Sequence, residues 1–92
     1  RNRVRLEVAR LHSEAERARS QLALYARSIL PQGRAAVEAA TAGYRAGRTE
    51  FSSVLESQST LFAYEIAYVR LLSEFARTVA ELERATGGEV LR

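Results

Sequence analysis

Residues 42–51, with the sequence AGYRAGRTEF, separate two long runs of helical periodicity. Gly47 can adopt the left-handed conformation that commonly follows the last residue of a helix. Thr49 is a residue type that caps helix N-termini, and Glu50 places a carboxylate where the helix dipole favours one. Two long helices joined by so short a turn must fold back on each other. The sequence therefore predicts an all-α fold, a long antiparallel helical hairpin with this turn as its tip.

The arm before the turn carries an apolar heptad pattern, which is typical of a coiled coil. Small residues near the tip predict that the two helices approach closely there. Pro31 predicts an interruption confined to residues 28–32, either as a bend or as a true helix boundary. The predicted seam consists of Val4, Val8, Leu11, Ala15, Ala18, Leu22, Tyr25, Ile29, Gln32, Ala36, Ala39 and Gly43.

The arm after the turn carries two neighbouring stripes. One continues the heptad spacing as Phe51, Val54, Gln58, Leu61, Glu65, Tyr68, Leu72, Phe75, Val79 and Leu82. The other consists of Leu55, Phe62, Ile66, Val69, Ala76 and Ala80. One partner helix covers one stripe, so the second predicts self-association or further helices of a longer parent protein.

Polar residues inside the predicted seam leave two alternatives open. Glu65 either stays partly exposed or forms an ion pair with Arg27 or Arg34 of the first arm. The second helix is expected to end near Thr86-Gly87-Gly88, where two glycines interrupt the pattern. The whole chain is then one hairpin domain over residues 1–92, with helices at about 3–45 and 50–85, a tip at 45–50 and a short C-terminal tail.

Composition argues against catalysis and bound cofactors. The chain has 92 residues, 47% of them hydrophobic, with no cysteine and a net charge of +3. His12 has no second histidine, cysteine or aspartate at ligand spacing, so no metal site is expected. No nucleophile motif or phosphate-binding loop occurs. The sequence predicts a non-enzymatic chain without catalytic residues, cofactor or metal.

Charge is unevenly distributed between the two arms. Residues 1–45 contain nine Arg and four Glu (9 − 4 = +5), and residues 46–92 contain five Arg and seven Glu (5 − 7 = −2). This difference favours antiparallel pairing of the arms. In the first arm Glu7, Glu14 and Glu16 lie among the arginines, which indicates a solvated surface rather than a nucleic-acid site.

An ordered set of motifs lies along residues 29–87. It resembles the C-terminal half-repeat of TolC-type outer-membrane efflux factors, and it is closest to the branch that exports heavy metals and cations. The chain lacks the aspartates that the family carries near its tips, because it contains no Asp. The motifs are Leu30-Pro31, Gly43-Tyr44-x-x-Gly47, Phe51, Leu55, Gln58, Leu61, Glu65, Tyr68, Ala80-Glu81-Leu82-Glu83 and Gly87.

The resemblance implies the periplasmic α-helical barrel wall of a trimeric outer-membrane exit duct in a tripartite efflux system. The family's membrane strands and its other half-repeat are absent, so we expect a fragment that contacts the membrane only through missing parts of its parent. By the same resemblance, the tip contacts a periplasmic adaptor protein, also called a membrane fusion protein. The tip residues implied in this contact are Tyr44, Arg45, Ala46, Gly47, Arg48, Thr49, Glu50 and Phe51.

A second interpretation comes from a different class of function. A free-standing coiled-coil module for oligomerisation, or a helical module associated with nucleic acid, would show the same helical periodicity. The tip distinguishes the two interpretations, because a generic hairpin tolerates any turn whereas a duct needs a narrow, glycine-containing one. The arrangement of charges favours the interpretation without nucleic acid.

Overall fold

The chain folds into helices joined by a single turn. The computed structural model describes residues 2–90 and the side chains up to residue 87. The elements are α1 (Asn2–Leu24), a π-helical turn η1 (Tyr25–Ile29), α2 (Leu30–Arg45) and α3 (Phe51–Val90). No strand occurs among residues 2–90. The prediction of an all-α helical hairpin is confirmed.

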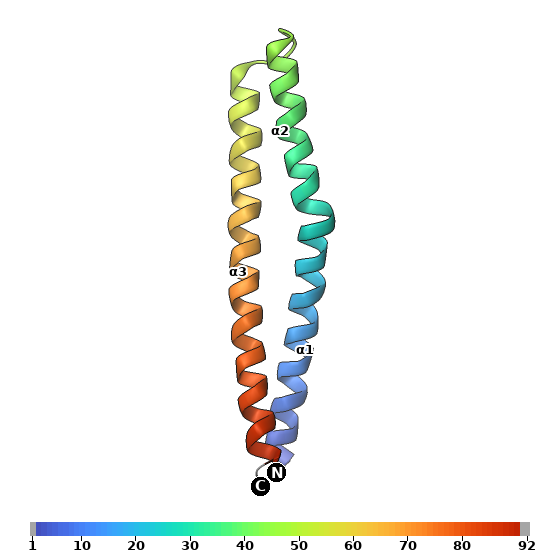
Figure 1. Cartoon of the computed structure of the whole chain (residues 1–92), viewed down its shortest axis with the longest axis vertical. Helices are drawn as coiled ribbons and strands as arrows, with labels where there is room; N and C mark the ends of the chain where they lie inside the picture. The colour runs from blue at the N-terminus through green and yellow to red at the C-terminus, as the bar shows by residue number, and fades with distance from the viewer. Residues whose placement is uncertain (1, 91–92) are drawn as a thin grey trace. The chain divides into compact units, whose positions relative to one another are not determined.

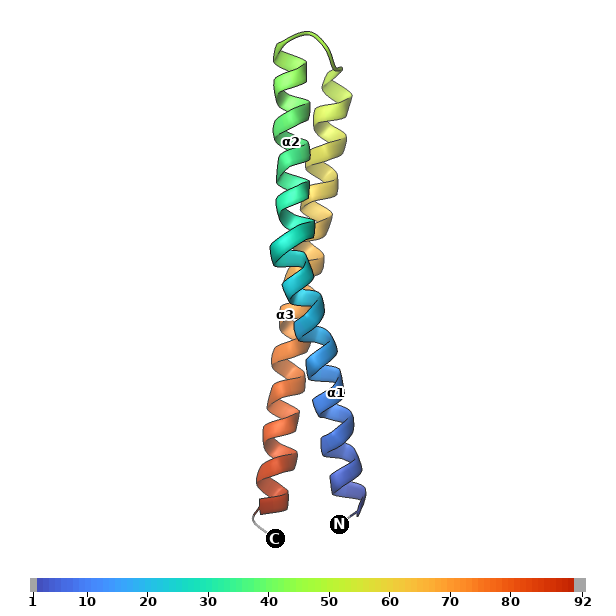
Figure 2. The same cartoon turned by 90° about the vertical axis from the view of Figure 1, so that its right-hand side faces the viewer.

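The helices form two compact units, which we describe separately. The base unit comprises residues 2–22 of α1 and residues 70–90 of α3. The tip unit comprises residues 23–69, which include η1, α2, the turn and the first part of α3. Within each unit the chain runs up one helix and down the other, and the two views of Figures 1 and 2 show the paired helices side by side.

The α1 side of the base-unit core follows the predicted seam, whereas on the α3 side Leu71 is partly buried in place of the predicted Leu72. Leu11 and Ala15 of α1 are buried. Val4, Val8, Ala18 and Leu22 on the same face of α1 are partly buried, as are Leu71, Phe75, Thr78, Leu82 and Ala85 of α3. Burial recurs along α1 at alternating spacings of four and three, so the heptad interpretation of α1 is confirmed.

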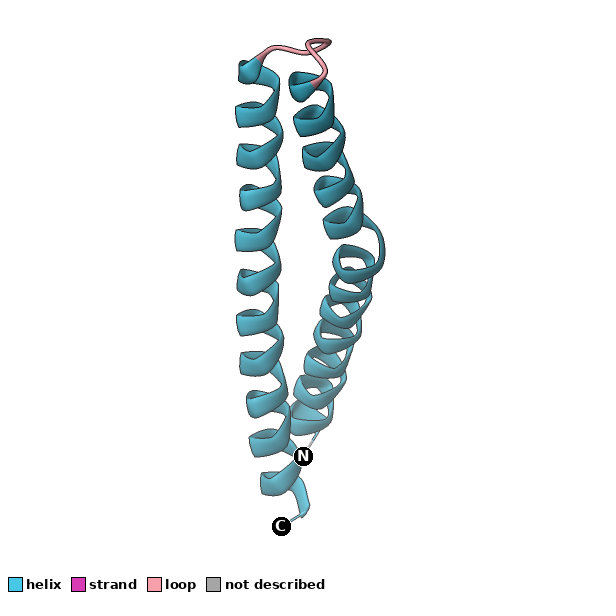
Figure 3. Cartoon of the chain, turned by 45° about the horizontal axis from the view of Figure 1, so that its top comes forward, coloured by secondary structure: helices cyan, strands magenta, loops and turns pink. Residues whose placement is uncertain are grey.

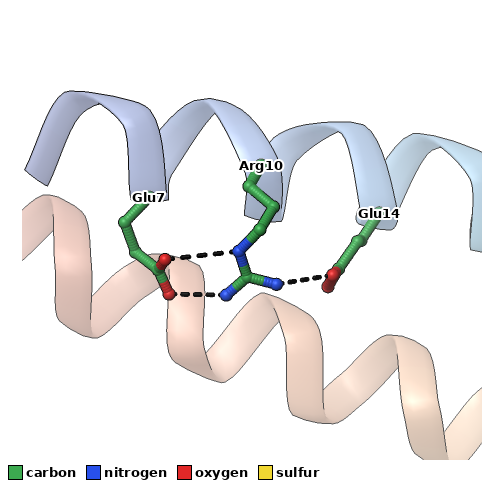
Figure 4. A network of polar contacts seen from close by, with 3 residues as sticks. All are labelled: Glu7, Arg10 and Glu14. Carbon is green, nitrogen blue, oxygen red and sulfur yellow. Dashed lines mark hydrogen bonds and ion pairs between the residues drawn. The ribbon is translucent and has the colours of Figure 1, made fainter. Parts of the chain in front are cut away.

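Charged side chains pair with one another along α1 (Figure 4). Arg10 donates to Glu7 at 2.6 Å and to Glu14 at 2.7 Å, across one turn in each direction. The hydrogen bond from Arg10, with its charge, holds the pKa of Glu7 below its ordinary value, and the same bond raises the pKa of Arg10. These groups are exposed, so the network supports local helicity rather than the fold as a whole.

The π-helical turn η1 lies just ahead of Pro31. The backbone N–H of Leu30 donates to the carbonyl oxygen of Tyr25, five residues back instead of four. Proline has no N–H and its ring crowds the carbonyl four residues back, which here belongs to Arg27. A widened turn relieves that conflict without ending the helix. The interruption covers Tyr25–Ile29, so it starts earlier than the predicted residues 28–32.

The seam of α2 is displaced by one residue from the predicted one. Leu30 and Gly33 are buried and Val37 and Ala40 are partly buried. The predicted seam residues Gln32, Ala36 and Ala39 are exposed, so this part of the prediction is wrong, whereas Gly43 is buried as predicted. The physical reason is η1, because a π-helical turn adds one residue to the helix and turns every later residue by one position.

The inner face of α3 in the tip unit also differs from the predicted seam. Val54 is buried and Ser57, Leu61 and Tyr68 are partly buried. The predicted seam residues Gln58 and Glu65 of this unit are exposed, and so is Leu72 in the base unit. The observed spacing passes through Ser57, whose hydroxyl donates to the carbonyl oxygen of Val54 at 2.8 Å. Gln58 is as polar as Ser57, so hydrophobicity does not choose between them, and the prediction of Gln58 follows only from continuing the alternating spacing of Phe51 and Val54.

Small and aromatic residues fill the interior of the tip unit. A Cβ atom added at Gly33 would lie 3.1 Å from Leu61 Cδ1 and 3.3 Å from Tyr64 Cδ2, so α2 and α3 approach closely there. The rings of Tyr25 and Tyr68 have centroids 6.5 Å apart. Among the residues that the structure describes, Glu65 forms no ion pair with Arg27 or Arg34. Its side chain is exposed, which is the other of the two predicted alternatives.

The predicted end of the second helix is wrong. Helix α3 continues through Gly87 and Gly88 to Val90. In the described part of the chain only Gly47 has a positive φ, so Gly87 does not adopt the left-handed conformation that ends a helix. No described helix has the length and apolar character needed to cross a membrane.

Candidate functional site at the hairpin tip

The C-terminus of α2 is closed by backbone hydrogen bonds around Gly47 (Figure 3, pink segment). Gly47 has φ 75°, as predicted. Its N–H donates to the carbonyl oxygen of Tyr44 at 3.0 Å, and the N–H of Arg48 donates to that of Gly43 at 2.7 Å. These two bonds are the Schellman arrangement, which satisfies carbonyl groups that the helix end would otherwise leave open. The turn is therefore a defined structure rather than a loose loop.

Thr49 ties the turn back to α2. Its N–H donates to the carbonyl oxygen of Gly43 at 3.2 Å and its hydroxyl donates to that of Ala40 at 3.1 Å. Helix α3 begins at Phe51, so Glu50 rather than Thr49 occupies the position before it. The predicted N-cap role of Thr49 is therefore wrong, because its hydroxyl faces the preceding helix.

Gly43 allows this close approach, whereas the sequence pattern predicts only a seam position for it. A Cβ atom at position 43 would lie 2.9 Å from both Cγ2 and Oγ1 of Thr49. Contacts below 3.0 Å essentially do not occur for real Cβ atoms, so any side chain here requires a shift of the Thr49 side chain or of the turn that carries it. The signal in the sequence was a second glycine four residues before Gly47, which only the structure connects to Thr49.

An aromatic pair stands at the junction of the two arms. The ring centroids of Tyr44 and Phe51 are 5.3 Å apart and the rings are tilted by 53°. Phe51 thus lies beside Tyr44, but it is not buried as its place in the predicted seam requires. Tyr44 remains 48% exposed and Phe51 53% exposed, so the pair offers apolar area to a partner as well as to the turn.

All eight predicted tip residues are exposed and belong to the tip unit. Arg45, Arg48 and Glu50 make no ion pair with any other described residue. The tip therefore presents two guanidinium groups and one carboxylate in water, beside the aromatic pair. In the described part of the chain no three His, Cys, Asp or Glu side chains cluster to hold a metal ion. This chemistry suits recognition of another surface by polar and apolar contacts.

Substitution of Gly47 tests the backbone conformation of the turn. We expect Gly47→Val to lower the free energy of unfolding by about 1–2 kcal/mol, because a β-branched residue is strained at positive φ. The added Cβ meets no atom within 4 Å, so crowding makes no contribution. Urea unfolding followed by circular dichroism measures the change.

Gly87 provides the matched control for that measurement. It also has no neighbour within 4 Å of an added Cβ, but its φ is not positive. Gly87→Val should cost nothing, or stabilise α3 by a few tenths of a kcal/mol, because valine is a better helix former than glycine. Equal effects of the two substitutions would contradict the strain argument.

Comparison with known proteins gives a partial likeness. The chain is 33% identical over 60 residues to the cobalt-zinc-cadmium resistance protein CzcC of Cupriavidus metallidurans. The matched stretch is 65% of this chain and 14% of that relative, so the chain spans a small part of the relative's length. No family model matches the chain, and no solved structure gives a significant match. The likeness to CzcC gives modest support to the resemblance to efflux factors.

Proposed function

We propose that this chain is a non-enzymatic, periplasmic helical segment of an outer-membrane efflux duct. Its tip docks on a periplasmic adaptor protein in a tripartite system that exports metal cations. The observation that carries this proposal is the 33% identity over 60 residues to a cobalt-zinc-cadmium resistance protein.

The geometry of the tip supports the docking step. The Schellman bonds and the Thr49 contacts fix the turn, so little conformational entropy is lost when a partner binds. The exposed rings of Tyr44 and Phe51 supply apolar contact area, and Arg45 and Arg48 supply hydrogen-bond donors without internal partners. Together these features describe a rigid, narrow interaction surface.

Charge reversal at the tip tests the proposal in the full-length parent protein. We expect Arg45→Glu with Arg48→Glu to reduce metal efflux by about tenfold or more, since both donors to the adaptor become repulsive carboxylates. Cross-linking to the adaptor should fall in parallel, while the trimer of the duct stays intact on native gels. Efflux by whole cells loaded with zinc or cadmium gives the functional readout.

A matched control distinguishes local contact from a change of net charge. Arg70→Glu with Arg77→Glu makes the same charge change at two exposed positions of the base unit. This variant should keep efflux and cross-linking near the unmodified level. Unchanged efflux and cross-linking in the tip variant would show that Arg45 and Arg48 only keep the tip soluble.

A further inference from the structure

An apolar stripe runs along α3 in the tip unit, beside the face that packs on α2. Leu55, Phe62 and Val69 each follow an inward-facing residue by one position, or about 100° around the helix. Phe62 is 63% exposed, and Leu55, Ile66 and Val69 are also exposed. We call these four residues the tip stripe. The paired arm covers the inner face of α3 and leaves the tip stripe without a partner in the described part of the chain.

A face of small side chains lies on α2, on the side away from the interior. Ala35, Ala39 and Ala42 are exposed, and each follows an inward-facing residue by two positions, or about 200°. Their spacings of four and three keep them on one side of the helix. We call these three residues the alanine face. Large side chains pack more closely on such a face than on a second row of large side chains, because large and small residues interdigitate.

The two arms of the tip unit carry opposite charge. Residues 51–69 contain two Glu and no Arg (−2), and residues 23–45 contain three Arg and one Glu (3 − 1 = +2). None of these charged side chains forms an ion pair with another described residue. Two tip stripes placed together would bring four carboxylates into one contact, whereas a tip stripe placed on α2 joins arms of opposite sign. Charge therefore favours the alanine face as the docking partner.

We propose that the tip stripe of one copy docks on the alanine face of a second copy of this chain. The copies lie side by side in the same orientation, so α3 of one runs antiparallel to α2 of the next, as it does within the hairpin. Since Gly33 lies level with Leu61, Phe62 then comes level with Pro31 and Leu55 with Ala39. This inference concerns the tip unit alone and does not depend on the proposed function.

Such a contact is heterologous, because it joins two different surfaces. Each added copy leaves one tip stripe and one alanine face open, so association continues beyond a dimer unless a ring closes. The tip stripe exposes on the order of a few hundred Å², which places the contact among weak interfaces. We therefore expect species larger than dimers at high concentration of the unmodified chain.

Complementation between two variants of the 92-residue chain tests the pairing. Phe62→Glu with Ile66→Glu disables the tip stripe, and Ala35→Glu with Ala42→Glu disables the alanine face. Each variant alone should be a monomer in sedimentation equilibrium, with its dissociation constant raised by about 100-fold or more. An equal mixture should form 1:1 dimers, because one intact stripe then meets one intact face, and the series stops there.

Other outcomes of this experiment overturn the proposal. Self-association of the alanine-face variant alone would show that the stripe pairs with itself. A mixture that stays monomeric, while circular dichroism shows both variants helical, would show that the two surfaces do not meet. The matched control, Gln32→Glu with Ala36→Glu, makes the same charge change at exposed positions on another side of α2. It should associate as the unmodified chain does, and loss of association in this control would also overturn the proposal.

Disulfide trapping gives a second measurement that introduces no charge into the contact. The chain contains no cysteine, so Leu55→Cys and Ala39→Cys each create a single reactive position. Since the two positions share a level in the proposed contact, an oxidised mixture should yield the mixed disulfide in about tenfold or greater excess over the Leu55→Cys homodimer. An excess of that homodimer would overturn the proposal, because it would place two tip stripes against each other.

Discussion

Replacing Gly43 by valine is expected to lower the free energy of unfolding by about 2–3 kcal/mol, because it overpacks the tip. The Cβ atom alone would lie 2.9 Å from two atoms of Thr49, and valine adds two methyl groups to that contact. Thr49 cannot move aside easily, since its β-branched side chain is stiff and its hydroxyl is bonded to Ala40. Urea unfolding followed by circular dichroism measures the loss.

The same valine at Gly87 controls for helix propensity, because an added Cβ there meets nothing within 4 Å. A double-mutant cycle then isolates the contact with Thr49. Thr49→Ala removes Cγ2 and Oγ1 and leaves Cβ at 3.4 Å from the added atom, which is an ordinary van der Waals distance. Gly43→Ala should therefore cost less in the Thr49→Ala background, with a coupling of about 1 kcal/mol. Additive effects would show that the turn absorbs the added atom.

Glutamate at Phe62 and Ile66 is expected to abolish self-association of the chain. Four apolar side chains of the tip unit remain uncovered along α3, with Leu55 49%, Phe62 63%, Ile66 37% and Val69 58% exposed. The predicted exposure of this stripe is confirmed, whereas self-association remains a prediction. Burying a large apolar side chain contributes about 1.5–3 kcal/mol, so loss of two should raise the dissociation constant by about 100-fold or more.

Sedimentation equilibrium over a range of concentrations measures this change. The control introduces glutamate at Gln58 and Ser59, two exposed polar positions of the same helix segment, so that the change of charge is matched. The control should associate nearly as the unmodified chain does. An unmodified chain that sediments as a monomer at millimolar concentration would contradict the prediction. It would show that the chain remains folded and monomeric with these four apolar side chains exposed to water.

The chemistry of the turn could be read from the sequence because it depends on neighbouring residues. Gly47 has the positive φ expected of a residue after a helix end, and Tyr44 meets Phe51 across the turn. The role of Thr49 could not be read in this way. Its hydroxyl reaches Ala40, nine residues back, and that bond exists only because Gly43 lets the turn fold onto α2.

By itself the sequence determined that the chain is a helical hairpin with its turn at Gly47, since helix formers, apolar periodicity and one glycine act locally. Only the tertiary structure decided which side chains face inward in the tip unit, whereas those of α1 follow the sequence pattern. A periodicity argument assumes a constant number of residues per turn, and η1 adds one residue, so Gly33 replaces Gln32 in the seam. The choice of Ser57 over Gln58 likewise follows from packing against α2, where the small residue fits and bonds to its own helix.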